Sequence, residues 1–114
     1  MADSGMLIGW DRSVPGRESI ALELFEGMVH YLRKLHVQGD IDSFEPVMLG
    51  AHGGTLNGFV LIRGEQDRLD ALRNSDEFRA MVVKANMALQ GFTVLRAHFG
   101  NEVAQLMGVY GSLA

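Results

Sequence analysis

Apolar residues recur along this chain in two patterns, and the change from one to the other divides it into helices and strands. From residue 17 to residue 37 they return every three or four positions, as Leu24, Met28, Tyr31 and Leu35 do, which is the spacing of one helix face. Short apolar runs without this period, bounded by glycine or polar residues, predict strands. The predicted strands are residues 6–12, 44–51, 56–63 and 92–99, and the predicted helices are residues 17–37, 66–89 with a break at 74–78, and 102–110.

Two helix boundaries carry local sequence signals. Gly39 follows the first predicted helix and is expected to be its left-handed cap, because glycine adopts that conformation without steric cost. Ser75, within the run NSDEF, is expected to cap a new helical turn, and Asp76 and Glu77 suit the positive end of the helix dipole.

The order of elements is βαββαβ followed by a short C-terminal helix. This is the α+β, ferredoxin-like arrangement, in which four strands form one antiparallel sheet. At 114 residues the chain is expected to form one domain over residues 1–114, with residues 1–5 as a flexible tail.

Two turns compete in the hairpin between the second and third strands. Asn57-Gly58 is the stronger turn dipeptide in general, but it leaves arms of unequal length. Gly53-Gly54 lets arms of similar length pair, with Met48 opposite Phe59. We therefore expect the turn at Gly53-Gly54, with Asn57-Gly58 as a possible bulge.

Both faces of this hairpin are predicted to be apolar. Alternation places Val47, Leu49, Ala51, Leu56, Val60 and Ile62 on one face, and Phe44, Pro46, Met48, Phe59 and Leu61, with His52 and Arg63 at the ends, on the other. In the last strand, Leu95, Ala97 and Phe99 share one side, and Phe92, Val94, Arg96 and His98 share the other. Helices cover only one face of such a sheet, so a second copy of the chain is expected to cover the open sheet face in a homodimer.

The chain resembles the dimeric α/β barrel superfamily, in which two ferredoxin-like domains pack sheet against sheet around a central cleft. The resemblance rests on the first strand, on Pro15-Gly16 before a long helix, on the doubly apolar hairpin and on LDALRNSDEF at residues 69–78. The superfamily includes antibiotic-biosynthesis monooxygenases that need no cofactor, haem-degrading enzymes, small isomerases and decarboxylases, and stress-responsive proteins. Haem-degrading members use a histidine on the second helix, and residues 66–89 contain none.

Five residues are expected near the cleft of such a dimer: Trp10, Met48, Phe59, Arg96 and His98. Arg96 and His98 lie two apart on one strand, so both project to the same side, where they could hold a carboxylate or enolate with His98 as acid or base. Alternatively, Arg96 pairs with a carboxylate across the dimer and His98 lies at the rim of the sheet. Trp10 could stack on a flat ligand or serve packing alone.

The glycine-rich segment HGGT, residues 52–55, does not predict a phosphate site. A phosphate-binding loop opens onto the N-terminus of a helix, whereas this segment opens onto a strand. His52 has no histidine or carboxylate at ligand spacing around it, so no metal site is expected.

Composition narrows the classes of partner. The net charge is −4 and basic residues are scattered, which argues against nucleic-acid binding. With no cysteines, thiol chemistry is excluded. The N-terminus resembles neither a signal peptide nor a membrane span, so we expect a cytoplasmic protein without membrane contact.

Three hypotheses of function remain open. The first is a homodimer that binds a small apolar or aromatic molecule in its central cleft, with no cofactor. The second is a cofactor-independent monooxygenase or isomerase acting on an aromatic or polyketide-like substrate, oriented by Arg96 and His98. The third is a purely structural dimer whose cleft is filled by side chains.

Overall fold

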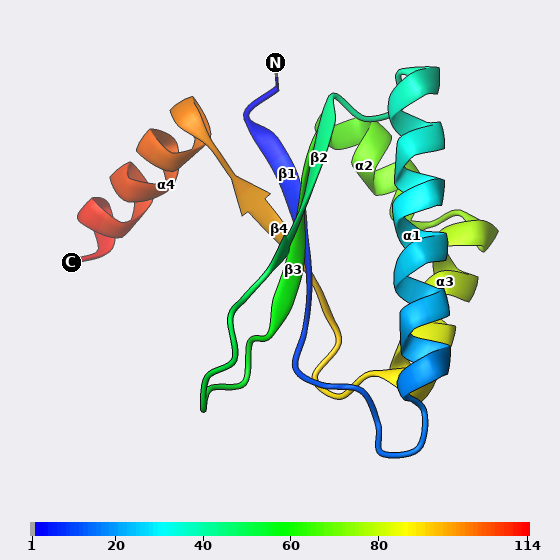
Figure 1. Cartoon of the computed structure of the whole chain (residues 1–114). Helices are drawn as coiled ribbons and strands as arrows, with labels where there is room; N and C mark the ends of the chain where they lie inside the picture. The colour runs from blue at the N-terminus through cyan, green and yellow to red at the C-terminus, as the bar shows by residue number, and fades with distance from the viewer. Residues whose placement is uncertain (1) are drawn as a thin grey trace.

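The computed structural model describes residues 2–114 and contains a single four-stranded sheet (Figure 1). Along the chain the elements are β1 (Ser4–Trp10), α1 (Glu18–Gln38), β2 (Ser43–Met48), β3 (Gly58–Arg63), α2 (Gln66–Arg73), α3 (Asp76–Ala88), β4 (Thr93–His98) and α4 (Gly100–Leu113). The strand order is β2-β3-β1-β4, and every neighbouring pair is antiparallel. The predicted α+β ferredoxin-like fold is therefore confirmed.

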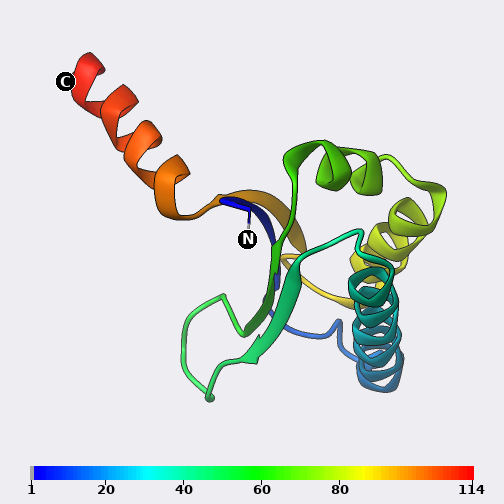
Figure 2. The ribbon, with the colours of Figure 1, turned by 90° about the horizontal axis from the view of Figure 1, so that it is seen from above.

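Three helices, α1, α2 and α3, lie against one face of the sheet and form the core with it (Figures 1 and 2). Met6 and Ile8 of β1 and Val60 and Ile62 of β3 are almost fully buried on this helix-covered face. Leu32 of α1 is buried in the same cluster. Burying one such side chain stabilises the fold by about 1.5–3 kcal/mol, so this layer holds the helices in place. None of these three helices, nor any other in the described chain, has the length and hydropathy of a membrane span.

The predicted helix boundaries at Gly39 and Ser75 are confirmed. Gly39 has a φ of 82°, and its N–H donates to the carbonyl of His36 at 3.1 Å. Ser75 Oγ accepts a hydrogen bond from the N–H of Phe78 at 3.3 Å, and α3 begins at the next residue, Asp76.

Other boundaries differ from the prediction. β1 begins at Ser4, so the expected tail is wrong at residues 4 and 5; residue 1 lies outside the described residues. The strands of the hairpin end at Met48 and begin again at Gly58, and residues 49–57 form a loop. α4 is longer than predicted because it continues in both directions, from Gly100 to Leu113.

The predicted register of the hairpin is wrong by one residue. Met48 pairs with Gly58 and Val47 with Phe59, and Gly58 pairs regularly with Trp10 on its other side, so no bulge forms there. A one-residue shift turns a strand over. Val47 therefore shares a face with Phe59 rather than with Val60. Gly53 and Gly54 lie at the loop tip, but neither has the positive φ that the predicted turn requires.

None of the described helices covers the second face of the sheet, and this open face is mainly apolar. Its apolar residues are Leu7 on β1, Val47 on β2, Phe59 and Leu61 on β3, and Leu95 and Ala97 on β4. Glu45, Arg63 and Thr93 lie on the same face, because they pair with Leu61, Gly5 and Gly9. α4 leaves the end of β4 on this side and extends away from the rest of the molecule (Figures 1 and 2).

Candidate functional site

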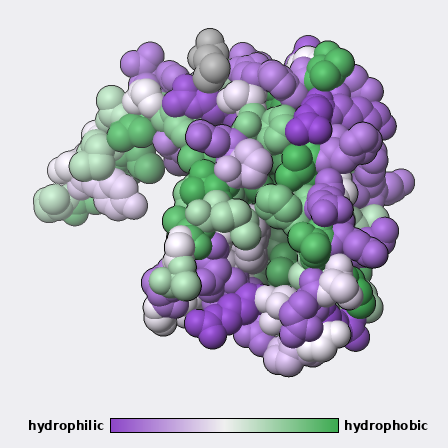
Figure 3. Space-filling view, viewed as in Figure 1, coloured by the Kyte–Doolittle hydropathy of each residue, from purple (hydrophilic) through white to green (hydrophobic). Residues whose placement is uncertain are grey.

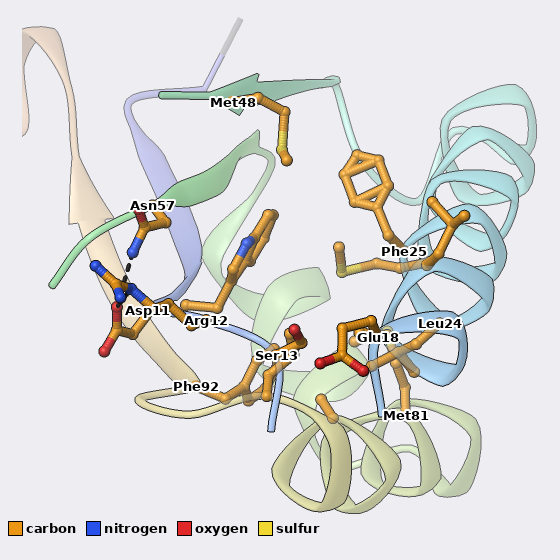
Figure 4. Close-up of a pocket in the computed structure, with 16 residues that line it drawn as sticks. Asp11, Arg12, Ser13, Glu18, Leu24, Phe25, Met48, Asn57, Met81 and Phe92 are labelled. Carbon is orange, nitrogen blue, oxygen red and sulfur yellow. Dashed lines mark hydrogen bonds and ion pairs between the residues drawn. The ribbon is translucent and has the colours of Figure 1, made fainter. Parts of the chain in front are cut away.

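A cavity of about 640 Å³ lies between α1, α3 and the end of the sheet at which β1 and β2 finish. On this side of the molecule, apolar side chains gather around a hollow between the sheet and α1 (Figure 3). Phe25 from α1 and Met48 from β2 lie on facing sides of the cavity (Figure 4). Its apolar wall consists of Trp10, Ala21, Leu22, Leu24, Phe25, Met28, Met48, Met81, Ala85, Leu89 and Phe92.

Trp10 is held in the wall of the cavity from two directions. Its ring meets Phe25 edge to face, with centroids 5.8 Å apart and an interplanar angle of 76°. Its other contact is the backbone of Gly58, where a Cβ atom would lie 2.6 Å from the indole. Position 58 must therefore be glycine for the indole to lie where it does, and this contact fixes the floor of the cavity.

The polar groups of the cavity lie on the segment that follows β1. Asp11 accepts a hydrogen bond from the Asn57 amide at 2.7 Å and lies 3.7 Å from the guanidinium of Arg12. The backbone of this segment is fixed as well, because Asp11 N donates to Gln90 O at 2.9 Å. Glu18, at the first turn of α1, accepts from the N–H of Gly16 at 3.2 Å. Asp11, Arg12 and Asn57 thus lie at one side of an otherwise apolar cavity, and Glu18 lies apart from them, near Leu24 and Met81 (Figure 4).

A second cavity, between α1 and α3, shares the side chains of Leu24, Met28 and Met81 with the first. Unbranched methionine side chains change conformation at low cost. The shared wall can therefore adapt its shape to a molecule in the first cavity.

Two of the five predicted site residues, Trp10 and Met48, line the cavity, and the other three do not. Phe59 lies on the open face. Arg96 and His98 pair with Met6 and Ser4 of β1, so they lie on the opposite face from Phe59. The expected grouping of Phe59 with Arg96 and His98 in one cleft is wrong. β3 presents Phe59 on the open face as expected, whereas β4 presents Arg96 and His98 on the helix-covered face.

Arg96 and His98 both contact residues of their own chain. Arg96 lies 3.4 Å from the carboxylate of Asp70 on α2, and the amide oxygen of Gln66, when turned toward it, accepts at 2.6 Å. The carboxylate that Arg96 contacts here belongs to α2 of its own chain, whereas the alternative expected one across the dimer. A catalytic role for either residue stays a prediction, and neither lines the cavity.

His98 belongs to a small polar cluster at the start of α4. Its Nδ1 lies 2.7 Å from Glu102 Oε1, and Ser4 Oγ donates a short hydrogen bond to the other oxygen of Glu102. The bonds from Ser4 and then His98 lower the pKa of Glu102 below its ordinary value of 4.5. This cluster ties α4 to the start of β1.

His52 makes its contacts within the hairpin loop. Its Nδ1 accepts from the N–H of Gly54 at 2.8 Å, so its Nε2 carries the proton and donates to Leu56 O at 2.6 Å. The ring therefore stabilises the loop.

Sequence reasoning missed Phe25, Asp11 and Asn57 as cavity residues. Phe25 belongs to the apolar face of the first predicted helix. The periodicity of that face does not indicate which of its residues borders a cavity. Asp11 reads as the start of a loop. The contact between Asp11 and Asn57 joins residues 46 apart, and no local pattern announces it.

These features define a protein of the ferredoxin-like fold with a cavity between the sheet and its helices. No protein-family model and no curated protein matches the chain. Among solved structures it is similar to a dimeric protein of unknown function from Bacteroides fragilis NCTC 9343, with 12% identity over 85% of this chain and 97% of the other and a TM-score of 0.60. It is also similar to an ethyl tert-butyl ether D (EthD) family protein from Bacillus halodurans C-125, with 13% identity, 85% and 99% coverage and a TM-score of 0.62. A third similar structure is a dimeric ferredoxin-like protein of unknown function from Thermobifida fusca YX, with 15% identity, 87% and 93% coverage and a TM-score of 0.60.

Proposed function

We propose that this protein binds a small, flat, mainly apolar molecule in the cavity between α1 and the sheet, and that it does so as a homodimer. The observation that carries the proposal is the cavity itself, which has about the volume of a small-ligand pocket and a wall of apolar and aromatic side chains. The site differs in place from the central cleft expected from the sequence, because it lies within one subunit.

The lining of the cavity specifies the chemistry of its ligand. Trp10 and Phe25 offer aromatic surfaces to a ring. Asp11 and Glu18 contribute two carboxylates to the lining, whereas Arg12 is its one basic residue. A neutral or cationic molecule therefore suits the cavity better than an anion does.

The homodimer is proposed on two grounds. Large exposed apolar surfaces mark interaction sites, and the open face offers a mainly apolar surface formed by all four strands. Two of the similar solved structures are described as dimeric. A second copy packed by twofold symmetry would cover this face.

The ligand site can be tested by reducing its volume. Ala21 lines the cavity, so the substitution Ala21→Phe adds a ring inside it. We expect the affinity for the neutral fluorescent probe N-phenyl-1-naphthylamine to fall at least tenfold, measured by titrating the emission of the probe.

The matched control is Ala71→Phe, which adds the same ring to an exposed position of α2. It should leave the affinity within about twofold of the wild type. Equal binding by all three proteins would mean that the probe binds elsewhere and would contradict the proposed site.

A second candidate function is proton-transfer catalysis of the isomerase type, and the arrangement of Asp11 favours it. Asp11 is among the residues that line the cavity, and its carboxylate is oriented by Asn57, as a general base must be oriented. With a candidate carbon acid, Asp11→Asn should leave binding nearly unchanged but abolish solvent deuterium exchange into the ligand. If exchange proceeds at the wild-type rate in this variant, Asp11 is not the base.

A further inference from the structure

We propose that α4 is an arm that packs on a second copy of this chain, beside the open face of that copy's sheet. The inference rests on the homodimer proposed above and adds the element that holds the two subunits together.

The surface of α4 is apolar and unburied. Val103, Leu106, Met107 and Tyr110 recur at the spacing of one helix face, and each is at least 40% exposed. No residue of α4 is buried. Glu102 is the one charged residue between positions 100 and 114. A helix that stays in water carries polar residues on its exposed side, so the stripe of α4 is suited to contact with another surface.

The direction of α4 is fixed by contacts at its first turn. Gly100 has a φ of 48°, which turns the chain out of β4. Asp3 accepts a hydrogen bond from the N–H of Asn101 at 3.1 Å, and Ser4 and His98 hold Glu102. These contacts aim the arm away from its own sheet, to the side that the open face looks toward (Figures 1 and 2).

Phe99 makes the arm and the open face one continuous surface. Its ring covers Gly5 of β1, where a Cβ atom would lie 2.3 Å from the ring, so glycine is needed there. The guanidinium of Arg63 lies 4.0 Å from the centroid of the same ring. A second copy that docks on the open face therefore meets the start of α4 at the edge of that face.

The contact area indicates what α4 contributes. A sheet of four strands with six or seven residues each has a face of roughly 20 by 20 Å. A helix of 14 residues is about 21 Å long and about 10 Å wide, so it adds roughly half as much again. A stable interface buries about 800 Å² on each partner. The arm therefore enlarges the footprint of the sheet by about half and adds to the area that a dimer interface can bury.

A lipid surface suits α4 less well than a second copy does. Helices that lie on membranes carry lysine and arginine on their polar face, and residues 100–114 contain neither. In a twofold-symmetric dimer, α4 of each subunit packs on the other subunit, so the contact made by α4 is present twice.

The decisive experiment compares two charge insertions on opposite sides of α4. Leu106→Glu places a carboxylate in the apolar stripe, and Gln105→Glu places the same group on the opposite side of the helix. Both positions are exposed in the single chain, so both variants should fold. In sedimentation equilibrium we expect Leu106→Glu to raise the dimer dissociation constant at least tenfold and Gln105→Glu to change it less than twofold.

A photo-crosslinker at Met107 identifies the surface that the arm contacts. In dimers mixed from ¹⁴N- and ¹⁵N-labelled chains, we expect cross-links between differently labelled chains. Cross-links only within one chain, or capture only by phosphatidylglycerol vesicles, would overturn the proposal.

Leu61→Glu on the open face separates the two proposals. If it dissociates the dimer while Leu106→Glu does not, the homodimer stands and the arm is refuted. If the wild type is a monomer, the homodimer itself fails. The cavity experiment with Ala21→Phe is read independently of both results.

Discussion

Gly58 shows how a single position controls the candidate site, because the indole of Trp10 occupies the space that a side chain there would need. A Cβ atom at position 58 would lie 2.6 Å from the ring. We expect Gly58→Ala to lower the free energy of unfolding by about 1–3 kcal/mol, as overpacking does, and to shift the emission of Trp10. Trp10 is the single tryptophan of the chain, so its fluorescence in a urea titration reports both effects.

Gly27→Ala is the control for this substitution. Gly27 lies within α1, and a Cβ atom there would meet nothing within 4 Å. Alanine in a helix is more favourable than glycine by about 1 kcal/mol, so this variant should be more stable with unchanged emission. An equally stable Gly58→Ala protein would show that Trp10 is free to move.

The sequence predicts residues well where the signal is local. Gly39 and Ser75 act through bonds that span three or four positions, so their roles follow from their immediate neighbours. Trp10 and Met48 were expected in a cleft on the open face, and the structure places both in the wall of the cavity on the helix-covered side instead. The partners of Asp11 and Arg96 lie far away in the sequence, and composition does not identify them.

Among the elements, the β2–β3 hairpin shows why register is harder to predict than strand content. Nine residues, 49–57, join the strands in a loop without a regular two-residue turn. The pairing therefore depends on the conformation of the whole loop, and a difference of one residue exchanged the two faces. Both faces are apolar, so the hydrophobic pattern could not reveal the error.

The attachment of α4 to the body should weaken in acid. Ser4 first, and then His98, lower the pKa of Glu102 below 4.5, and the charge of Arg96 acts in the same direction. Because the pKa of Glu102 is lowered in the folded state, its stabilising bonds to Ser4 and His98 are fully present above pH 4.5. They are lost as the pH falls through the pKa that Glu102 has in the folded protein. We expect the cross-peaks of residues 100–113 in NMR spectra to shift and broaden in that range, before those of α1 change.

Glu102→Gln removes this titration while it keeps the shape of the side chain. The variant should show a loosened α4 at neutral pH and a smaller further change on acidification than the wild type, because the Asp3 carboxylate still accepts from the N–H of Asn101. A variant whose α4 signals match the wild type at pH 7 would show that the carboxylate does not anchor the helix.

For the whole molecule, the proposed dimer depends on apolar contacts and should therefore tolerate salt. Charges on a surface are screened within about 10 Å at 0.1 M ionic strength, whereas apolar contacts are not weakened by screening. We expect the protein to sediment near twice its mass of 12.5 kDa at both 0.05 M and 0.5 M sodium chloride. Dissociation at the higher salt concentration would point to an interface of charged residues instead.

The position of β1 at the centre of the sheet has a consequence for synthesis. Its two neighbours are β3 and β4, and β4 is the last strand to be made. Until residues 93–98 have emerged, one edge of the most buried strand lacks its partner, and such edges recruit strands from other chains. Pairing β1 with β4 also closes a loop of most of the chain, which slows folding. We therefore expect β1 to be the strand of this sheet that stays exposed to aggregation for the longest time during synthesis.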